Sequence, residues 1–245
     1  MADTTNDLWR GLGSIARQHL DTRSYAKPPL AERLQQLGMA TAGELVNGIP
    51  VEVAIPGVEV FHRKVFHQRF RGYFSEFARE GEDSVGKIGL WPKQWATAKM
   101  FAGTSKGFHI HPPHIPEGTA PDAWFRRLFV DEPQNYALRP YDKEQWDVMF
   151  FIQGICEMFL IDERVGMPRK KMRFIIEGDD LRGENNCGVI IPAGVAHAIR
   201  CASSQDLIMV YGTSTTFVPA NEGRIMHGIE TPDTPPDWER YWQIA

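Results

Sequence analysis

From about residue 51 onward the chain consists of short runs rich in β-branched and aromatic residues, separated by glycine, proline, asparagine and aspartate. Many short runs at this spacing are typical of β-sandwiches and jelly rolls, in which each strand ends in a turn or loop. The sequence therefore predicts a mainly β domain over residues 51–230. The expected strands are 58–65, 72–77, 84–90, 96–102, 107–111, 148–153, 155–162, 172–177, 188–191, 198–201 and 207–211.

Three segments depart from this pattern. Residues 1–50 carry apolar residues at helical spacing, which predicts a helical N-terminal extension packed on the sheet or on a second copy. Residues 116–143 mix aromatic and charged residues, which predicts a partly helical insertion, either a lid beside a site or a surface excursion. Residues 231–245 contain several prolines and are expected to lie along the surface as a tail.

Composition narrows the class of protein. The 245-residue chain is 42% hydrophobic and 24% charged, as in an ordinary globular protein. Its net charge of -4 argues against nucleic acid or an anionic membrane as a partner. We expect no signal peptide and no membrane span, because the apolar runs are short, and therefore a cytoplasmic location. The three cysteines have no metal-binding spacing and are expected to be reduced, buried thiols.

Three histidines stand out by their spacing. His109 and His111 are separated by one residue, so a strand places both side chains on the same face. His197 follows a Pro-x-Gly turn and can be brought beside them. Imidazoles that converge on one interior face form a metal site or an acid/base site. A hydrogen-bonded polar interior without a metal is the third possibility.

Residues 103–111 (GTSKGFHIH) and 192–197 (PAGVAH) resemble the two motifs of the cupin superfamily. The resemblance implies a double-stranded β-helix, the cupin jelly roll. It also implies a carboxylate seven residues before the glycine of a central hairpin. With Gly154 as that glycine the carboxylate is Asp147, which fits the strand register better than the alternative, Glu117.

A longer series of segments resembles the dTDP-4-dehydrorhamnose 3,5-epimerase family. Each segment alone is weakly specific, whereas their common order is specific for the family and less so for its exact reaction. The segments are 55–58 (IPGV), 65–76 (VFHQRFRGYFSE), 103–113 (GTSKGFHIHPP), 154–168 (GICEMFLIDERVGMP), 191–197 (IPAGVAH), 207–211 (LIMVY) and 217–219 (FVP).

The resemblance implies catalytic roles for three residues. His109 matches the histidine that removes a proton next to the ketone of a nucleotide sugar. Tyr211 matches the tyrosine that acts as acid on the opposite face. Lys106 stands where the family has an arginine, so the positive charge is kept but the bidentate guanidinium donor is lost. The aspartate that pairs with the family's catalytic histidine has no clear match in this sequence.

Four further residues match positions that bind substrate in the family. Arg71 and Glu76 match residues that hold the nucleotide diphosphate, for which a guanidinium is well suited. Gln94 matches a glutamine near the base. Phe217 stands where the family has a tyrosine that stacks on the ligand.

Two departures from the family pattern occur together. Asp147 stands where the family has a lysine, and His111 stands where it has a glutamine. Aspartate and histidine are both residue types that bind metals. We therefore expect a site for one divalent transition metal: Zn, Fe, Mn, Co or Ni. If His109 binds the metal it cannot also be the free base, and His114 or Glu144 would then take that role. The candidate ligands are His109, His111, Asp147 and His197.

These observations predict a sugar or nucleotide-sugar epimerase or isomerase that removes a proton next to a carbonyl, with or without a metal. One alternative is a metal-dependent oxygenase or lyase that uses the three-histidine, one-carboxylate set. The other is a non-catalytic carbohydrate-binding cupin. The partner is expected to be a small sugar or nucleotide sugar, and the resemblance implies a homodimer.

Overall fold

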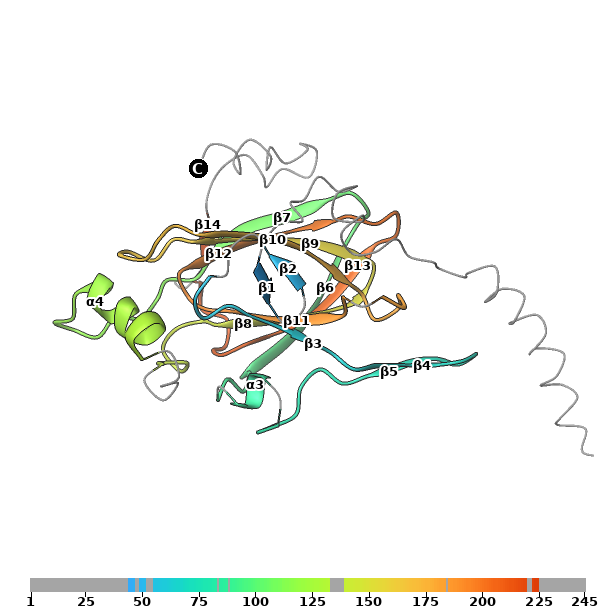
Figure 1. Ribbon diagram of the computed structural model, residues 1–245, viewed down its shortest axis with the longest axis horizontal. Coiled ribbons are helices and arrows are strands. Elements are labelled where there is room, and N and C mark those ends of the chain that lie inside the picture. The colour runs from blue at the N-terminus through green and yellow to red at the C-terminus, as the bar shows by residue number, and fades with distance from the viewer. Residues whose placement is uncertain are drawn as a thin grey trace, which may run out of the picture.

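The computed structural model describes residues 44–46, 49–51, 55–82, 84–87, 89–132, 139–183, 185–219 and 222–224. Two antiparallel sheets lie face to face (Figure 1). In spatial order, the first contains β10 (Lys171–Glu177), β9 (Ile155–Asp162), β12 (Val195–Cys201), β7 (Ser105–Ile110) and β14 (Gly223–Arg224). The second contains β3 (Glu59–His62), β11 (Cys187–Ile191), β8 (Asp147–Gln153), β13 (Leu207–Thr213) and β6 (Gln94–Met100). The expected mainly β jelly roll is confirmed.

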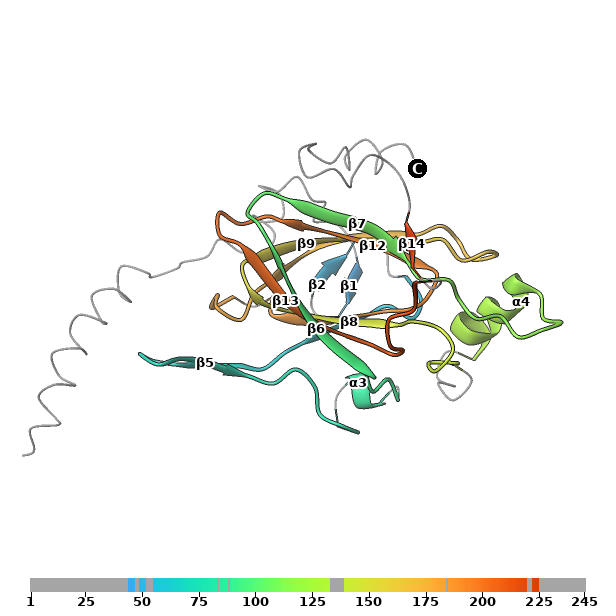
Figure 2. The same ribbon diagram turned by 180° about the vertical axis from the view of Figure 1, so that it is seen from behind.

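Two hairpins lie outside the main sheets. The first pairs β1 (Glu44–Val46) with β2 (Ile49–Val51) and contacts β3 and β10, an edge strand of each sheet. It therefore lies across one open side of the sandwich, as both views show (Figures 1 and 2). The expected helical extension over residues 1–50 is wrong at the five hairpin residues that fall within it, 44–46, 49 and 50. Residues 1–43 and the tail 231–245 lie outside the described part of the chain.

The interior of the sandwich is unevenly filled. Toward β3, β11, β9 and β10 it holds a dense apolar core, in which Met158, Leu160 and Phe174 are fully buried. Burying each such side chain stabilises the fold by about 1.5–3 kcal/mol. The half between β8, β13 and β6 on one side and β12, β7 and β14 on the other instead contains polar side chains around a cavity.

The insertion at 116–143 contains a helix, α4 (Pro121–Arg126), that continues as a π-helix, η1 (Arg127–Asp131). Leu128 and Phe129 of this segment are buried together with Trp146 and Val148 on the outer side of β8. Among its described residues none lines the cavity. The insertion therefore covers the outside of a sheet, which favours the surface excursion over the lid.

The expected strand at 84–90 is wrong. Residues Ser84–Lys87 form a short helix, α3, and Val85 and Leu90 are both buried in the same apolar cluster. In a strand, residues five apart point to opposite faces. The helical turn, closed by a hydrogen bond from Leu90 N to Val85 O at 3.1 Å, brings both side chains to one side. Burial of both apolar residues thus overrides the local β propensity.

The second hairpin, β4 (Val65–Gln68) with β5 (Gly72–Ser75), projects away from the barrel (Figure 1). A buried ion pair anchors its base, since Arg63 Nη1 lies 2.7 Å from Asp179 Oδ1. Ser75 Oγ donates to the same carboxylate at 2.6 Å. Among the described residues, no helix has the length and apolar character needed to cross a membrane.

Candidate active site

The cavity between the sheets has a volume of about 280 Å³ and collects most of the residues singled out from the sequence. β7 and β12 of one sheet contribute histidines, and β8 and β13 of the other contribute Asp147 and Tyr211. His109 and His197 are direct cross-strand partners, so pairing of the strands places them side by side. The lining residues are Ala98, Lys106, His109, His111, Gln145, Asp147, Met149, His197, Ala198, Ile199, Met209, Tyr211, Phe217 and Glu222.

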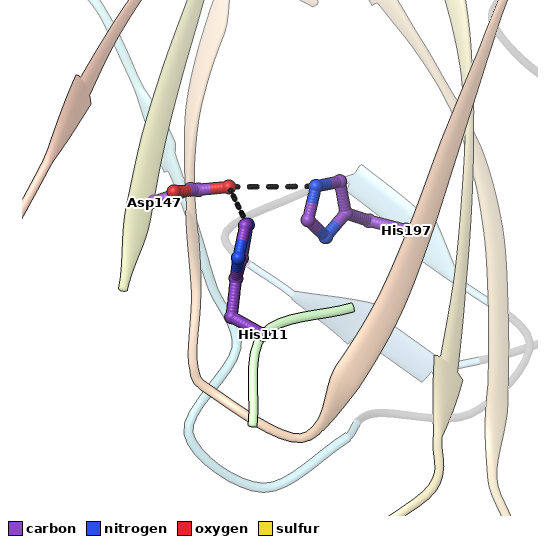
Figure 3. Close-up of side chains that lie close together, drawn as sticks. All are labelled: His111, Asp147 and His197. Atoms are coloured by element: carbon purple, nitrogen blue, oxygen red, sulfur yellow. Dashed lines mark hydrogen bonds and ion pairs between the residues drawn. The ribbon is translucent and has the colours of Figure 1, made fainter. Parts of the chain in front are cut away.

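His111, Asp147 and His197 converge in the buried part of this cavity (Figure 3). Their candidate ligand atoms all lie within 4.8 Å of one another. Asp147 Oδ2 lies 3.2 Å from His111 Nε2 and 3.4 Å from His197 Nε2. Each of the three side chains is at most 6% exposed. Nitrogen and carboxylate ligands of this kind can hold a divalent transition metal, or the groups can share protons.

Local backbone features position the two histidines. His111 follows the last residue of β7, and its carbonyl oxygen accepts a hydrogen bond from Gly194 N at 2.8 Å. Gly194 has a φ of +81°, and a Cβ there would lie 2.5 Å from Arg164 Cγ, so the Pro-x-Gly turn requires glycine. The turn leads directly into β12, which carries His197.

Several contacts act on the charge of Asp147. Burial by itself raises the pKa of this carboxyl, but the hydrogen bond to His111 and the charges of His111 and His197 lower it. Gln145 Nε2 donates to Asp147 Oδ1 at 2.9 Å and lowers the pKa further. The net pKa lies below its ordinary value, so the site favours the carboxylate.

His109 lies at the edge of this group and is more accessible, with 30% of its side chain exposed. Its ring stacks against His197 with the centroids 5.8 Å apart. Its Nδ1 lies 3.8 Å from Glu222 Oε2, and the other oxygen of Glu222 lies 3.9 Å from His111 Nδ1. The structure thus brings three of the four expected metal ligands together and places His109 beside a second carboxylate.

The chain was compared with known proteins in sequence and in fold. No protein-family model matches the chain. The spore coat polysaccharide biosynthesis protein SpsL of Bacillus subtilis is 26% identical over 180 residues, which span 72% of this chain and 93% of SpsL. The crystal structure of ChmJ, a 3'-monoepimerase from Streptomyces bikiniensis, in complex with dTDP-quinovose is 20% identical with a TM-score of 0.51, covering 76% of this chain and 84% of ChmJ.

Two further crystal structures have a similar fold. A dTDP-4-dehydrorhamnose 3,5-epimerase from Sulfolobus tokodaii is 20% identical with a TM-score of 0.51, over 76% of this chain and 86% of that one. A dTDP sugar isomerase from Desulfovibrio desulfuricans is 11% identical with a TM-score of 0.53, over 76% and 96%. This chain has the cupin fold of the dTDP-sugar epimerases. The resemblance recognised in the sequence is confirmed at the level of the fold.

In this structure, three of the other expected site residues also line the cavity: Lys106, Tyr211 and Phe217. Tyr211 comes from β13, in the sheet opposite to the one that carries His109, so the two approach the cavity from different walls. Phe217 is 59% exposed. Gln94 does not line the cavity, but its Oε1 accepts a hydrogen bond from Phe217 N at 2.8 Å and so helps to hold that segment.

Arg71 and Glu76 lie outside the cavity of their own chain. Arg71 is exposed in the turn between β4 and β5, on the hairpin that projects from the barrel (Figure 1). Glu76 forms an ion pair with Arg79 at 2.8 Å and lines a separate hollow beside β3. A single chain therefore does not bring these two residues to the histidines.

The remaining alternatives from the sequence also lie elsewhere. Glu117 is exposed in a turn, so Asp147 is the carboxylate that faces the histidines. Glu144 accepts hydrogen bonds from Trp146 Nε1 at 2.7 Å and from His114 N at 2.6 Å, and neither Glu144 nor His114 lines the cavity. The suggested role of these two as bases therefore has no geometric support.

Two residues of the cavity were missed by the sequence reasoning. Gln145 lies two positions before Asp147, so the period of a strand would have placed it on the same face. Glu222 gave no comparable signal, because it precedes β14 and reaches the site only when that strand pairs with β7. Its Oε2 lies 3.8 Å from His109 Nδ1.

Proposed function

We propose that this chain is an epimerase or isomerase of a sugar or nucleotide sugar, in which His109 removes a proton next to a carbonyl group. The observation that carries the proposal is the placement of His109 and Tyr211 on opposite walls of one cavity, with Glu222 beside His109. ChmJ and the Sulfolobus enzyme are sugar epimerases and SpsL acts in polysaccharide biosynthesis, which supports the same class of reaction.

The residues suggest the following steps. His109 takes a proton from the carbon next to the carbonyl, and the electron pair of the broken C–H bond moves toward the carbonyl oxygen. Glu222 stabilises the imidazolium that forms on His109. Tyr211 then gives its hydroxyl proton to the same carbon from the opposite face, and solvent restores both groups. The configuration of the carbon is inverted, with no net change in atoms. Lys106 supplies positive charge in the same cavity.

The size of the cavity favours binding of one sugar ring inside it. Its volume of about 280 Å³ lies just below the usual range for small-molecule sites, about 300–1,000 Å³. A nucleotide attached to that sugar would therefore extend past the mouth. Exposed Phe217 offers an aromatic surface there on which a base or sugar can stack.

A homodimer is part of the same proposal. The β4–β5 hairpin exposes four large side chains, Phe66, Phe70, Tyr73 and Phe74, which are each 38–52% exposed. Apolar groups gathered on a projecting arm are typical of protein interfaces. In a dimer this arm could carry Arg71 to the cavity of the other subunit. The three free, buried cysteines fit a reducing compartment such as the cytoplasm.

The reaction is tested by solvent exchange. The full chain is incubated in deuterium oxide with dTDP-4-keto-6-deoxyglucose, and uptake of deuterium into the sugar ring is followed by NMR, with and without added divalent metal. We expect uptake with the wild-type chain and a loss of about 10²–10⁴-fold in its rate for His109→Asn. His62→Gln, which changes an exposed histidine outside the cavity, is the matched control.

Binding of this sugar without any exchange would contradict the proposal and favour the non-catalytic carbohydrate-binding alternative. The dimer is tested separately by light scattering on a sizing column. We expect the mass of two chains for the wild type and of one chain for Phe66→Ser with Phe74→Ser. A single-chain mass for both proteins would rule out the arm as an interface.

A metal-dependent oxygenase or lyase is a second candidate, favoured by the cluster of two histidines and one carboxylate. Such sets with open positions are typical of iron oxygenases. Oxygen uptake that depends on iron and on a sugar would support this candidate. The base-and-acid pair in the same cavity supports proton transfer instead, and we rank the epimerase first for that reason.

A further inference from the structure

The side chains of His111, Asp147 and His197 point at a common position (Figure 3). Both imidazoles turn Nε2 toward the same oxygen, Asp147 Oδ2, at 3.2 and 3.4 Å. All three side chains are buried, with 3–5% of each residue exposed, so these nitrogen and oxygen atoms face one another at short range. A neutral imidazole nitrogen and a carboxylate oxygen repel each other at this distance unless a positive ion or a hydrogen lies between them.

The other ring nitrogens face oxygen acceptors. His197 Nδ1 lies 3.4 Å from the carbonyl oxygen of Val195, which can only accept a hydrogen bond. His111 Nδ1 lies 3.9 Å from Glu222 Oε1. The contact with Val195 favours the hydrogen on Nδ1 of His197, which leaves a lone pair on its Nε2. For His111 the deciding contact is Gln145 Nε2, which lies 3.1 Å from His111 Nε2 and can only donate, so it favours a lone pair on that nitrogen. Histidines that bind metals are oriented in this way, by a carbonyl or carboxylate at the second nitrogen.

Two of the three separations between the groups also fit an ion, and the third is at most 4.8 Å. Ligands at about 2.0–2.1 Å from a tetrahedral metal lie about 3.3–3.5 Å from one another. The two nitrogen-to-oxygen distances at Asp147, 3.2 and 3.4 Å, are close to this range. The fourth direction opens to the cavity that also holds Lys106 and Tyr211. Three protein ligands with one open position are characteristic of catalytic metal sites.

We propose that His111, Asp147 and His197 bind one divalent transition metal ion, and that His109 remains outside the ligand set as the proton-transferring base. His109 contributes no atom to the convergent group, and its Nδ1 faces Glu222 at 3.8 Å. The conflict between the two roles of His109 is thereby removed. When bound, the ion supplies a Lewis acid next to the carbonyl oxygen of the substrate. The catalytic part of this inference rests on the proposed function, whereas the metal site does not.

The site is tested by metal content. The untagged full-length chain is purified without chelator, and its bound metals are measured by mass spectrometry. The metal-stripped chain is then titrated with Zn²⁺, Fe²⁺, Mn²⁺, Co²⁺ and Ni²⁺ separately, while its melting temperature is followed. We expect about one equivalent of metal per chain and a rise in Tm of about 5–10 °C at a hundredfold excess of an ion over its Kd.

Single substitutions test whether His109 belongs to the ligand set together with His111, Asp147 and His197. Asp147→Asn and His197→Gln should lower the bound metal at least tenfold, and His109→Gln should retain it. Circular dichroism of the metal-stripped variants checks that they fold, and the wild-type titration does not depend on them. The inference is overturned if none of the five ions binds the wild type, or if His109→Gln loses the metal as Asp147→Asn does. If the metal-free protein catalyses deuterium exchange, the proposed function stands and the metal has no part in the reaction.

Discussion

The thiol of Cys187 shows how burial changes the chemistry of a single residue. It lies where β11 pairs with β3, and removal from water raises its pKa to about 12. At pH 8 only about one thiol in 10⁴ would then be ionised, and the thiolate is the form that reacts. Burial raises the pKa of Cys156 well above its ordinary value as well.

We therefore predict that neither Cys156 nor Cys187 reacts with iodoacetamide at pH 8 in the folded chain. Mass spectrometry of the intact protein would count the modified thiols, and unfolding in guanidinium should expose all three cysteines. Rapid labelling of Cys187 before unfolding would show that this part of the sandwich opens in solution.

Glu144 is a second residue whose titration depends on its surroundings. Burial raises its pKa, while its hydrogen bonds from Trp146 and His114 and the charges of Arg164 and Arg139 lower it in part. Because the folded-state pKa lies above the unfolded value, folding favours the protonated form of this group. Its contribution to stability is complete below the unfolded pKa and is lost as pH rises through the folded pKa.

We accordingly expect the free energy of unfolding of the wild type, minus that of Glu144→Gln, to fall as pH increases from 4 to 7. Urea titrations at several pH values would measure this difference. A difference that rises with pH over this interval would mean that the hydrogen bonds and the arginines outweigh burial at Glu144.

At the scale of secondary-structure elements, a buried ion pair holds the base of the β4–β5 hairpin against the sandwich. Arg63 forms two hydrogen bonds with Asp179, at 2.7 and 3.0 Å, and both side chains are at most 1% exposed. The guanidinium also lies 5.0 Å from the ring centre of Phe77. The link joins the strand before the hairpin to the turn after β10, so it fixes where the arm leaves the barrel.

Removal of one partner leaves a buried charge without compensation. We predict that Asp179→Ala lowers the free energy of unfolding by about 3–5 kcal/mol. Arg126→Ala, which removes an exposed ion pair with Asp131 on the insertion, should have no measurable effect. Thermal and urea unfolding would compare the two variants. Equal effects would show that the Arg63–Asp179 pair is not buried in solution.

At the scale of the whole molecule, the described residues form three apolar clusters, and two of these share a sheet. One fills half of the interior, and the other packs α4 and η1 on the outside of β8 and β11. β8 therefore separates the outer cluster from the cavity that contains Asp147. The insertion contributes to the same fold as the site even though none of its described residues lines the cavity.

This arrangement predicts that the insertion unfolds together with the barrel. Leu128→Ala should lower the free energy of unfolding by about 2–4 kcal/mol, because Leu128 is only 2% exposed. Val130→Ala, two residues away and 53% exposed, is the matched control and should change it by less than about 0.5 kcal/mol. A separate early transition in wild-type unfolding, followed by tryptophan fluorescence, would contradict a single cooperative unit.

The sequence by itself determined the features that depend on neighbours along the chain. Alternating runs and turn residues predicted most strands, and Ile155–Asp162 was predicted to the residue. Asp147 was implied by the resemblance to the cupin motifs. The spacing of His109 and His111 and the Pro-x-Gly turn before His197 predicted from the residues alone that the histidines converge. These features follow from local backbone geometry, which the order of residues fixes directly.

Only the tertiary structure decided which of these groups meet. Pairing of β14 with β7 brings Glu222 to His109, although the two are more than a hundred residues apart. Stacking of the sheets brings Asp147 to His111 and His197 and leaves His109 outside this convergent trio. Burial of Val85 and Leu90 turned a predicted strand into a helix. Contacts of this kind depend on which faces pack together, and local propensity contains no information about that choice.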